Sequence, residues 1–418
     1  MKNFEVAIVG GGISGIALAI ALSKRNVPCA VYEQAHAFGE LGVGLGVTPN
    51  AARAMNICDA KVYEAFNKVS GAPYKWEILD GTDEKTDDFV HFTVGNGESG
   101  VRGCHRAHFL NGLVDLLPPG IIRFNKQLDR IEEPAGPSGK VRLIFGDGTT
   151  AEADAVVGSD GIKSHTRALL VGANHPSAKC TYTHKFSYRG LVPMQQAVEV
   201  LGPNGDKASG IWVGNDIHVV TYPVAQGTML NVVAHCTDHG DWPSETQLTL
   251  PCRLEDLAED TKGLSPRIRK LIGLIKNVDR WGQFDLGYRP LPTFAKGRIC
   301  LIGDAAHAST PYQGSGAGIC LEDAAVLASL LADGRVQDGA GLEAAFSAFD
   351  AVRRERGHFL VDSSRRTGEL LQLQSEHGKD FAKLEEELHQ LIKDMWYFDI
   401  DKNVTDALEN LGKRLSSK

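Results

Sequence analysis

The sequence predicts an α/β protein with a mainly parallel sheet, an inserted and mostly antiparallel sheet, and a helical C-terminal region. Three observations support this fold class. A pattern of strand, glycine-rich turn, helix and strand fills residues 6–32, short alternating strand patterns occupy residues 185–236, and amphipathic helical patterns begin near Gly341. At 418 residues, the chain is long enough for two domains, one of which can be discontinuous.

Composition limits the partners of this protein. The formal net charge of -8 argues against nucleic acid and anionic membranes, which usually bind surfaces with a basic excess. The eight cysteines are scattered singly without a C-x-x-C pattern, so we expect reduced thiols and a cytoplasmic location. No apolar stretch is long enough to span a membrane. We therefore expect a monomer or homodimer that binds a small molecule.

The N-terminal segment predicts one βαβ unit, with strands at 6–9 and 29–32 around a helix at 13–24. Its turn carries a G-x-G-x-x-G pattern formed by Gly10, Gly12 and Gly15. The first glycine permits the turn, the second lets a pyrophosphate approach, and the third lets the helix pack on the strand. This context predicts a Rossmann-like unit that binds a dinucleotide.

Glu33 follows the second strand, at about the position where an acidic residue binds ribose hydroxyls in such units. Its carboxylate would accept hydrogen bonds from a ribose diol and would repel a 2′-phosphate. The predicted nucleotide therefore carries an unphosphorylated adenosine ribose, as FAD and NAD do.

Two other glycine-rich stretches are less specific. Gly44 lies in "GVGLG", before a helix start predicted at Pro49. This stretch is either a flexible loop or backbone that lies against a flat ligand. A second G-x-G-x-x-G match begins at Gly95, but no amphipathic helix follows it, and Asn96-Gly97 is typical of a hairpin. We interpret that match as a turn.

Two further predicted strands end in a glycine and an aspartate. The strand at 155–157 is followed by Asp160, and the strand near residue 300 is followed by Asp304. Ligands of open α/β sheets lie beyond the carboxyl ends of the strands, so both aspartates are predicted to contact one extended cofactor. For Asp160, a plain helix N-cap is an equally open interpretation.

The middle of the chain contains the candidate substrate residues. Strand alternation places Arg189 among apolar neighbours, where it needs an anionic partner, either a ligand carboxylate or phenolate or a protein carboxylate. Tyr222 shares a strand face with His218, and a core tyrosine is the alternative interpretation. His235 and His239 are four residues apart, a spacing that brings two metal ligands together only on a helix, whereas this stretch is predicted to be the end of a strand and a turn. We predict no metal.

Together, the three glycine-bearing strand ends resemble those of single-component FAD-dependent aromatic hydroxylases, the group of para-hydroxybenzoate hydroxylase and salicylate hydroxylase. The matching motifs are Gly10 to Gly15 with Glu33, "DAVVGSDGIKSHTR" and "GRICLIGDAAHASTPYQGSGAG". The stretches "GVGLGVTPNA" and "HRAHFL" resemble the salicylate hydroxylase-like branch. The resemblance covers roughly residues 1–345.

The resemblance implies FAD as cofactor and NADH or NADPH as co-substrate. Asp304 would bind the ribityl or pyrophosphate part of FAD, and Asp160 would support a site shared by FAD and NAD(P)H. Arg106, which starts a predicted helix, would clamp phosphate or shield the cofactor, although a surface arginine is the commoner interpretation. Pro311 would lie near the flavin edge where O2 reacts, and we interpret His307 as a structural neighbour rather than a base. A predicted helix N-terminus would stabilise negative charge at the N1/C2=O edge of the flavin through Gly316, Ala317 and Gly318.

The implied reaction uses NAD(P)H to reduce FAD and O2 to form a C4a-hydroperoxide that attacks a phenolic ring. Arg189 would hold a phenolate or carboxylate, and Tyr222 would orient the substrate or relay a proton. Salicylate-type decarboxylative hydroxylation and hydroxylation or dearomatisation of a phenolic polyketide both fit. The alternatives are a flavin-dependent reductase or dehydrogenase and a non-catalytic flavin-binding redox sensor.

These assignments divide the chain into a FAD-binding domain, a substrate domain and a C-terminal region. The FAD-binding domain would comprise residues 1–75, 101–180 and 281–345, and the substrate domain residues 76–100 and 181–280. The C-terminal region, 346–418, would be a helical cap or a dimer face, since its charges are mixed.

Overall fold

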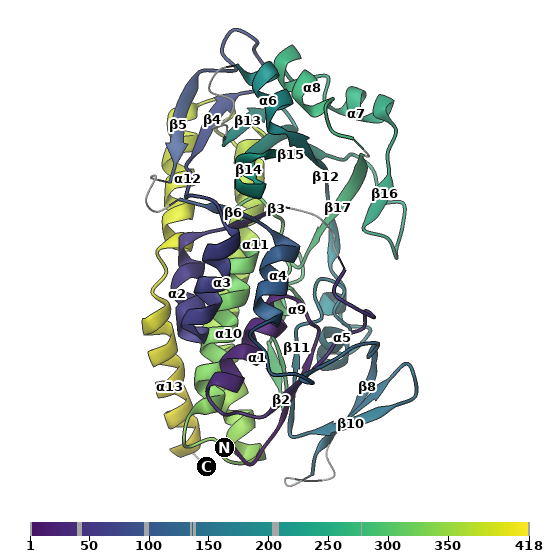
Figure 1. The fold of residues 1–418 in the computed structure, drawn as a ribbon, viewed down its shortest axis with the longest axis vertical. Helices are drawn as coiled ribbons and strands as arrows, with labels where there is room; N and C mark the ends of the chain where they lie inside the picture. Colours follow the sequence, from purple (N-terminus) through teal and green to yellow (C-terminus); the bar gives the residue numbers. More distant parts are fainter. Residues whose placement is uncertain are drawn as a thin grey trace.

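The computed structural model describes residues 2–39, 44–95, 100–133, 136, 139–202, 209–276 and 278–416. A mainly parallel sheet lies at one end of the elongated molecule and a larger sheet at the other, and long helices run along one side of both (Figure 1). The predicted α/β fold class is therefore confirmed. The turn predicted at Asn96-Gly97 lies outside the described residues.

The first sheet has six strands in the order β18-β19-β11-β1-β2-β7. All its neighbours are parallel except the β18–β19 pair. Its strands are β1 (Val6–Val9), β2 (Cys29–Tyr32), β7 (Ile122–Arg123), β11 (Ala155–Gly158), β18 (Ala295–Lys296) and β19 (Ile299–Leu301). The strand and helix bounds predicted for the N-terminal βαβ unit agree with β1, β2 and α1 (Ile13–Lys24).

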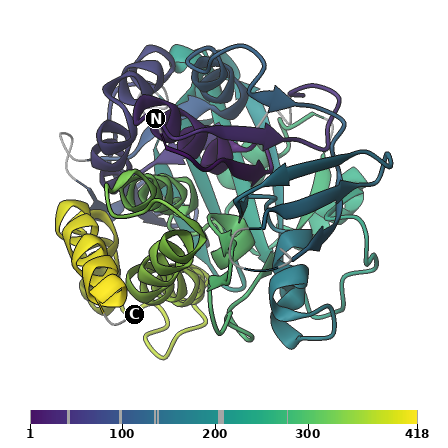
Figure 2. The same ribbon diagram turned by 90° about the horizontal axis from the view of Figure 1, so that it is seen from below.

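Helices and a small sheet cover the two faces of this sheet. On one face, α1 packs against α10 (Gly316–Ala332) in the largest hydrophobic core. On the other face lies a three-stranded antiparallel sheet made of β8 (Leu128–Glu132), β9 (Val141–Phe145) and β10 (Thr150–Ala153). Figure 2 shows this small sheet on the side opposite the C-terminal helices. Both faces of the parallel sheet are thus buried, as its continuous apolar strands require.

Shorter elements connect the two sheets. They are β3 (Gly44–Val47), α2 (Pro49–Cys58), α3 (Ala60–Val69), β6 (Arg102–His105), α4 (Arg106–Val114), α5 (His165–Val171) and α9 (Asp304–His307). Strands β3 and β6 pair as a two-stranded antiparallel ribbon. This ribbon brings Gly44 against the larger sheet.

The larger sheet has eight strands in the order β16-β17-β12-β15-β14-β13-β4-β5 and is antiparallel except between β13 and β4. Its strands are β4 (Trp76–Asp80), β5 (Val90–Val94), β12 (Thr181–Pro193), β13 (Gly210–Gly214), β14 (Ile217–Val224), β15 (Met229–Thr237), β16 (Thr249–Pro251) and β17 (Asp279–Asp285). The predicted antiparallel insertion is confirmed.

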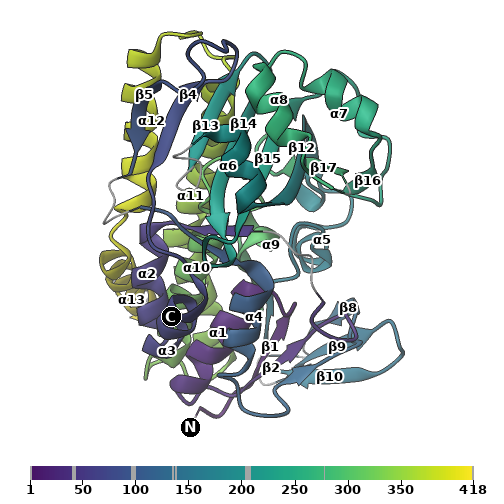
Figure 3. The same ribbon diagram turned by 45° about the horizontal axis from the view of Figure 1, so that its top comes forward.

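One face of the larger sheet is covered by α6 (Met194–Leu201), α7 (Leu254–Asp260) and α8 (Pro266–Ile272), which lie in front of it in Figure 3. Side chains alternate along each strand, so every second residue packs against these helices and the residues between them point to the opposite face. That opposite face is directed toward the parallel sheet and forms part of the site described below.

The C-terminal region is helical, as predicted. Helix α11 (Gly339–Leu371) reaches from the parallel sheet to the antiparallel sheet, and α12 (Phe381–Trp396) and α13 (Ile400–Ser416) follow it. The domain boundary proposed at residue 345 falls inside α11. The proposed domains are therefore tied together by one continuous helix.

Candidate active site

The strand order places three glycine-bearing strand ends side by side. Strands β1, β11 and β19 are neighbours and parallel, so their carboxyl ends meet at one edge of the sheet. At Gly10, where φ is +107°, a Cβ atom would lie 2.4 Å from the Ser159 carbonyl oxygen. At Gly15, a Cβ atom would lie 2.1 Å from the Gly10 carbonyl oxygen. Only glycine permits this close packing of turn, helix and neighbouring strand.

A cavity of about 380 Å³ lies between this edge and the antiparallel sheet. It brings together nine of the predicted site residues: Gly12, Gly44, Arg106, Arg189, Tyr222, Asp304, Pro311, Gly316 and Ala317. The other five predicted residues do not line it: Gly10, Gly15, Glu33, Asp160 and Gly318. Four of these five lie on the same turns and helices as lining residues, whereas Glu33 follows β2, which contributes no residue to the lining.

Two predicted carboxylates are engaged by the protein itself. Glu33 accepts hydrogen bonds from the backbone N–H groups of Gly11 at 2.7 Å and Ala35 at 2.8 Å. Asp160 accepts from the Thr166 backbone N–H at 2.9 Å and also bonds the hydroxyl of Ser164, the N-cap of α5. Asp160 is thus not itself the N-cap of α5, although its carboxylate supports the start of that helix, and its role toward a cofactor stays a prediction.

The remaining cradle fits an extended cofactor with phosphates and a flat ring. Apart from its own chain neighbours, a Cβ atom at Gly12, Gly161 or Gly316 would meet no atom of the described residues within 4 Å, so the backbone is open to a ligand at these positions. The N-cap residues of α1 and α10 make no side-chain capping hydrogen bond in the described structure, which suits the first N–H groups of both helices to negative charge. Arg106 lines the cavity and has no ion-pair partner among the described residues. These features suit the pyrophosphate and isoalloxazine parts of FAD.

Arg189 is the main charged group on the substrate-sheet side of the cavity. Its guanidinium carbon lies 4.6 Å from the centre of the Trp281 ring, and its buried Nε has no hydrogen-bond partner in the described part of the chain. No described carboxylate forms an ion pair with it. Burial lowers the pKa of Arg189. The sequence left open whether a protein carboxylate pairs with this arginine, and the described structure provides none.

Tyr222 faces the same cavity from β14. Its ring stacks on that of Tyr74 with centroids 5.8 Å apart. Its hydroxyl lies close to the Gly44 backbone, since a Cβ atom added at Gly44 would be 2.9 Å from the hydroxyl oxygen. Burial raises the pKa of Tyr222, and nearby Arg189 partly opposes this shift. The phenol is therefore neutral at pH 7 and can donate a hydrogen bond to an anion held by Arg189.

Several lining residues were not predicted from the sequence. They are mostly apolar or aromatic: Trp76, Ile211, Val233, His235, Thr310 and Tyr312. Val233 on β15 pairs with Arg189 on β12, so the two side chains point to the same face of the sheet. A prediction of this strand pairing would have identified Val233 as a residue of the site. For Trp76 no local signal existed, because β4 joins the sheet through a non-sequential pairing with β13.

A fully buried ion-pair network holds α10 and the Gly303 turn in place. Asp323 accepts from the Gly303 backbone N–H at 3.0 Å and from Arg353 Nε at 2.8 Å, and it pairs with His307 Nε2 at 2.6 Å. Glu322 pairs with Arg353 and with Arg356. His307 does not line the active-site cavity, which supports its interpretation as a structural residue.

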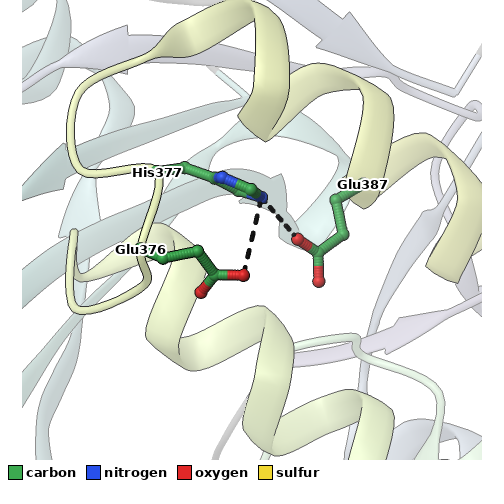
Figure 4. A group of neighbouring side chains, drawn as sticks. All are labelled: Glu376, His377 and Glu387. Carbon is green, nitrogen blue, oxygen red and sulfur yellow. Dashed lines mark hydrogen bonds and ion pairs between the residues drawn. The ribbon is translucent and has the colours of Figure 1, made fainter.

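One group in the described part of the chain has the composition of a metal site, namely Glu376, His377 and Glu387 (Figure 4). His377 Nε2 lies 2.9 Å from Glu387 and 4.0 Å from Glu376. However, Arg366 already pairs with Glu376 at 2.8 Å and with Glu387 at 2.6 Å. We interpret this group as an ion-pair network between α11 and α12.

The fold and the cradle define a flavoprotein, and the comparisons with known proteins agree. Residues 3–364 match the family described as FAD binding domain, so the chain belongs to this family. Within it, the chain is a FAD-dependent monooxygenase of the salicylate hydroxylase-like group. No helix in the described residues has the length and apolar character needed to cross a membrane.

Two relatives and one solved structure illustrate this placement. The FAD-dependent monooxygenase orf3 of Aspergillus niger is 40% identical, over 99% of this chain and 98% of the relative. The salicylate hydroxylase asL1 of Sarocladium schorii is 38% identical, over 96% of this chain and 89% of the relative. A solved salicylate hydroxylase substrate complex superposes with a TM-score of 0.85 at 30% identity, covering 97% of this chain and 98% of that chain.

Proposed function

We propose that this protein uses NAD(P)H and O2 to hydroxylate a phenolic substrate. The observation that carries the proposal is the Arg189 guanidinium, which has no ion-pair partner among the described residues and lines the cavity together with Tyr222. A guanidinium that has no carboxylate partner in the described part of the chain favours an anionic ligand, and a phenolate or carboxylate supplies that charge. The relatives named as salicylate hydroxylases support this substrate class.

The chain's own residues would position the reactants. Arg189 would hold the ionised oxygen of the substrate, and the neutral Tyr222 would donate a hydrogen bond to the same oxygen. Keeping the phenol ionised makes the ring more nucleophilic toward an oxygen electrophile. Ile211, Val220 and Val233 would surround the ring with apolar side chains and exclude water.

The cofactor cradle would position FAD beside this substrate. Bound FAD supplies the redox chemistry, accepting a hydride from NAD(P)H and activating O2. Gly12 and Arg106 would hold phosphate, and Asp304 would contact the ribityl or pyrophosphate part. The N–H groups at the start of α10, from Gly316 and Ala317, would stabilise negative charge on the ring. Pro311, on the cavity wall, would lie near the flavin edge.

The test is a screen of phenolic acids and phenolic aldehydes for stimulation of NAD(P)H oxidation by the FAD-loaded protein. Mass analysis of the product distinguishes the two open reactions, because hydroxylation or dearomatisation adds one oxygen, whereas salicylate-type hydroxylation also releases CO2. Replacement of Arg189 with Ala should abolish stimulation while FAD stays bound. The proposal fails if no phenol stimulates oxidation, and loss of FAD in the variant would refute the substrate-side role of Arg189. A cytoplasmic location and a monomer or homodimer stay predictions.

A further inference from the structure

The proposed reaction leaves one polar end of the cavity unused. On the cavity face of the antiparallel sheet, Tyr222 pairs with Asn231, four residues before His235 along β15. Two apolar residues, Val220 and Val233, pair with each other between these two ends. Successive same-face residues are roughly 7 Å apart along a strand. Along this face, Tyr222 and His235 therefore lie at opposite ends, with Val220 and Val233 between them, and Arg189 flanks this centre from β12, where it pairs with Val233.

Hydrogen bonds fix the orientation of the His235 imidazole. Its Nδ1 lies 2.8 Å from the Ser187 hydroxyl oxygen and 2.9 Å from the Gln283 amide nitrogen. With the Gln283 amide placed as in the structure, its N–H groups donate to Nδ1 and, at 2.7 Å, to the Ser187 hydroxyl oxygen, so Nδ1 is the acceptor and the ring proton is on Nε2. Nε2 makes no hydrogen bond to the described protein, and His235 lines the cavity. The ring therefore offers one N–H donor to a molecule in the cavity.

The surroundings keep this donor uncharged. Burial lowers the pKa of His235 to about 3, and the cations Arg189 and Lys185 contribute to the shift. His218 stacks on His235 with centroids 4.6 Å apart, and neither of its fully buried ring nitrogens has a hydrogen-bond partner among the described residues. This end of the cavity is thus polar but carries no charge of its own.

We propose that His235 forms a second substrate subsite, which binds an uncharged carbonyl oxygen through Nε2–H. The proposal rests on the proposed function, because it takes the phenolate end of the substrate to lie at Arg189 and Tyr222. A neutral donor suits the oxygen of an aldehyde or ketone, whereas an anionic group is better served by Arg189. The substrate class is then a phenol that carries an acyl group away from its hydroxyl, across the ring.

The test measures binding of two probes, 4-hydroxybenzaldehyde and 4-methylphenol, to the FAD-loaded protein through changes in flavin absorbance. The probes share the phenol and differ in the carbonyl oxygen. In His235→Leu, the preference for the aldehyde should fall by about 10-fold, as expected for one neutral hydrogen bond. His235→Gln, whose amide can place an N–H near the position of Nε2, should keep most of the preference. The greater acidity of the aldehyde probe affects all three proteins alike and cancels in this comparison.

The outcomes separate this proposal from the proposed function. If 4-methylphenol binds and the preference is the same in wild type and His235→Leu, the subsite is refuted and the proposed function stands. Equal weakening of both probes in His235→Leu would show a merely structural histidine and would also refute the subsite. If neither probe binds the wild-type protein and no phenol stimulates NAD(P)H oxidation, both proposals fail. FAD content and melting temperature of each variant confirm that the cradle is intact.

Discussion

Replacing Arg189 with methionine should weaken substrate binding and raise the stability of the protein at the same time. The arginine places a buried donor, Nε, where the described protein offers no acceptor, and burial lowers its pKa. Methionine keeps an unbranched stem of similar shape and removes the charge. Functional residues often carry such a stability cost, because their partner is the ligand.

The magnitude follows from two opposing contributions. An unsatisfied buried donor costs about 1–3 kcal/mol. The contact of the guanidinium with the Trp281 ring, at 4.6 Å, returns about 0.5–1 kcal/mol. The variant should therefore gain about 1 kcal/mol in the free energy of unfolding, a rise in melting temperature on the order of 1–2 °C. Loss of a charged hydrogen bond should weaken substrate binding by about 10- to 100-fold.

Arg280 provides a matched control on the neighbouring strand β17. It pairs with Asp238 at 3.4 Å and lies 3.8 Å from the centre of the Phe186 ring. Arg280 Nε is also buried without a hydrogen-bond partner among the described residues, but Arg280→Met additionally removes the ion pair with Asp238, which lies outside the cavity. Its melting temperature should therefore fall below that of Arg189→Met, and ligand binding should stay unchanged. The assay is thermal unfolding of the FAD-loaded proteins together with flavin-absorbance titration of 4-hydroxybenzaldehyde. A lower melting temperature for Arg189→Met with unchanged binding would show that Arg189 is a structural residue and would refute the reasoning.

Two further predictions concern the cradle and the response to acid. Gly15→Ala would place a Cβ atom 2.1 Å from the Gly10 carbonyl oxygen and should destabilise the apoprotein by about 1–3 kcal/mol. Gly12→Ala should weaken FAD binding without that loss of stability. Apoprotein melting and FAD titration check both variants, and equal melting temperatures would contradict the packing argument. Because burial lowers the pKa of His235 to about 3, below its unfolded value of 6.5, the unfolded state binds more protons between these values and stability falls on acidification. Between pH 7.5 and pH 5 this histidine should cost about 2 kcal/mol, so His235→Gln should lose less stability over that range, and parallel pH profiles would contradict the assignment.

The parts of the fold that depend on local pattern were predictable from the sequence. The βαβ unit was predicted from apolar periodicity and the glycine-rich turn after its first strand. The other two strand ends were predicted from a glycine and an aspartate that follow an apolar run. Parallel strands share an edge, so Gly12 and Asp304 could be expected at one site although they lie far apart in sequence.

The parts that depend on tertiary partners were not predictable. The sequence cannot show that the Glu33 carboxylate binds the Gly11 N–H, or that Asp160 bonds the first residues of α5. His235 was considered only as a metal ligand, because its place in the cavity depends on strand register with Ser187. The mixed charges of the C-terminal region predicted a helical cap or a dimer face, yet Arg353 of α11 is fully buried against α10.

The buried network around Asp323 has a consequence for the order in which the chain can fold during synthesis. Strand β19 must pair with β11, about 140 residues earlier, and Arg353 and Arg356 must then reach Glu322 behind it. Arg356 also donates to the carbonyl oxygens of Asp394 and Met395 at the end of α12. The N-terminal glycine turn therefore leaves the ribosome long before its supporting parts exist. Such non-local contacts slow folding, so a nascent chain should bind its nucleotide only after nearly complete translation.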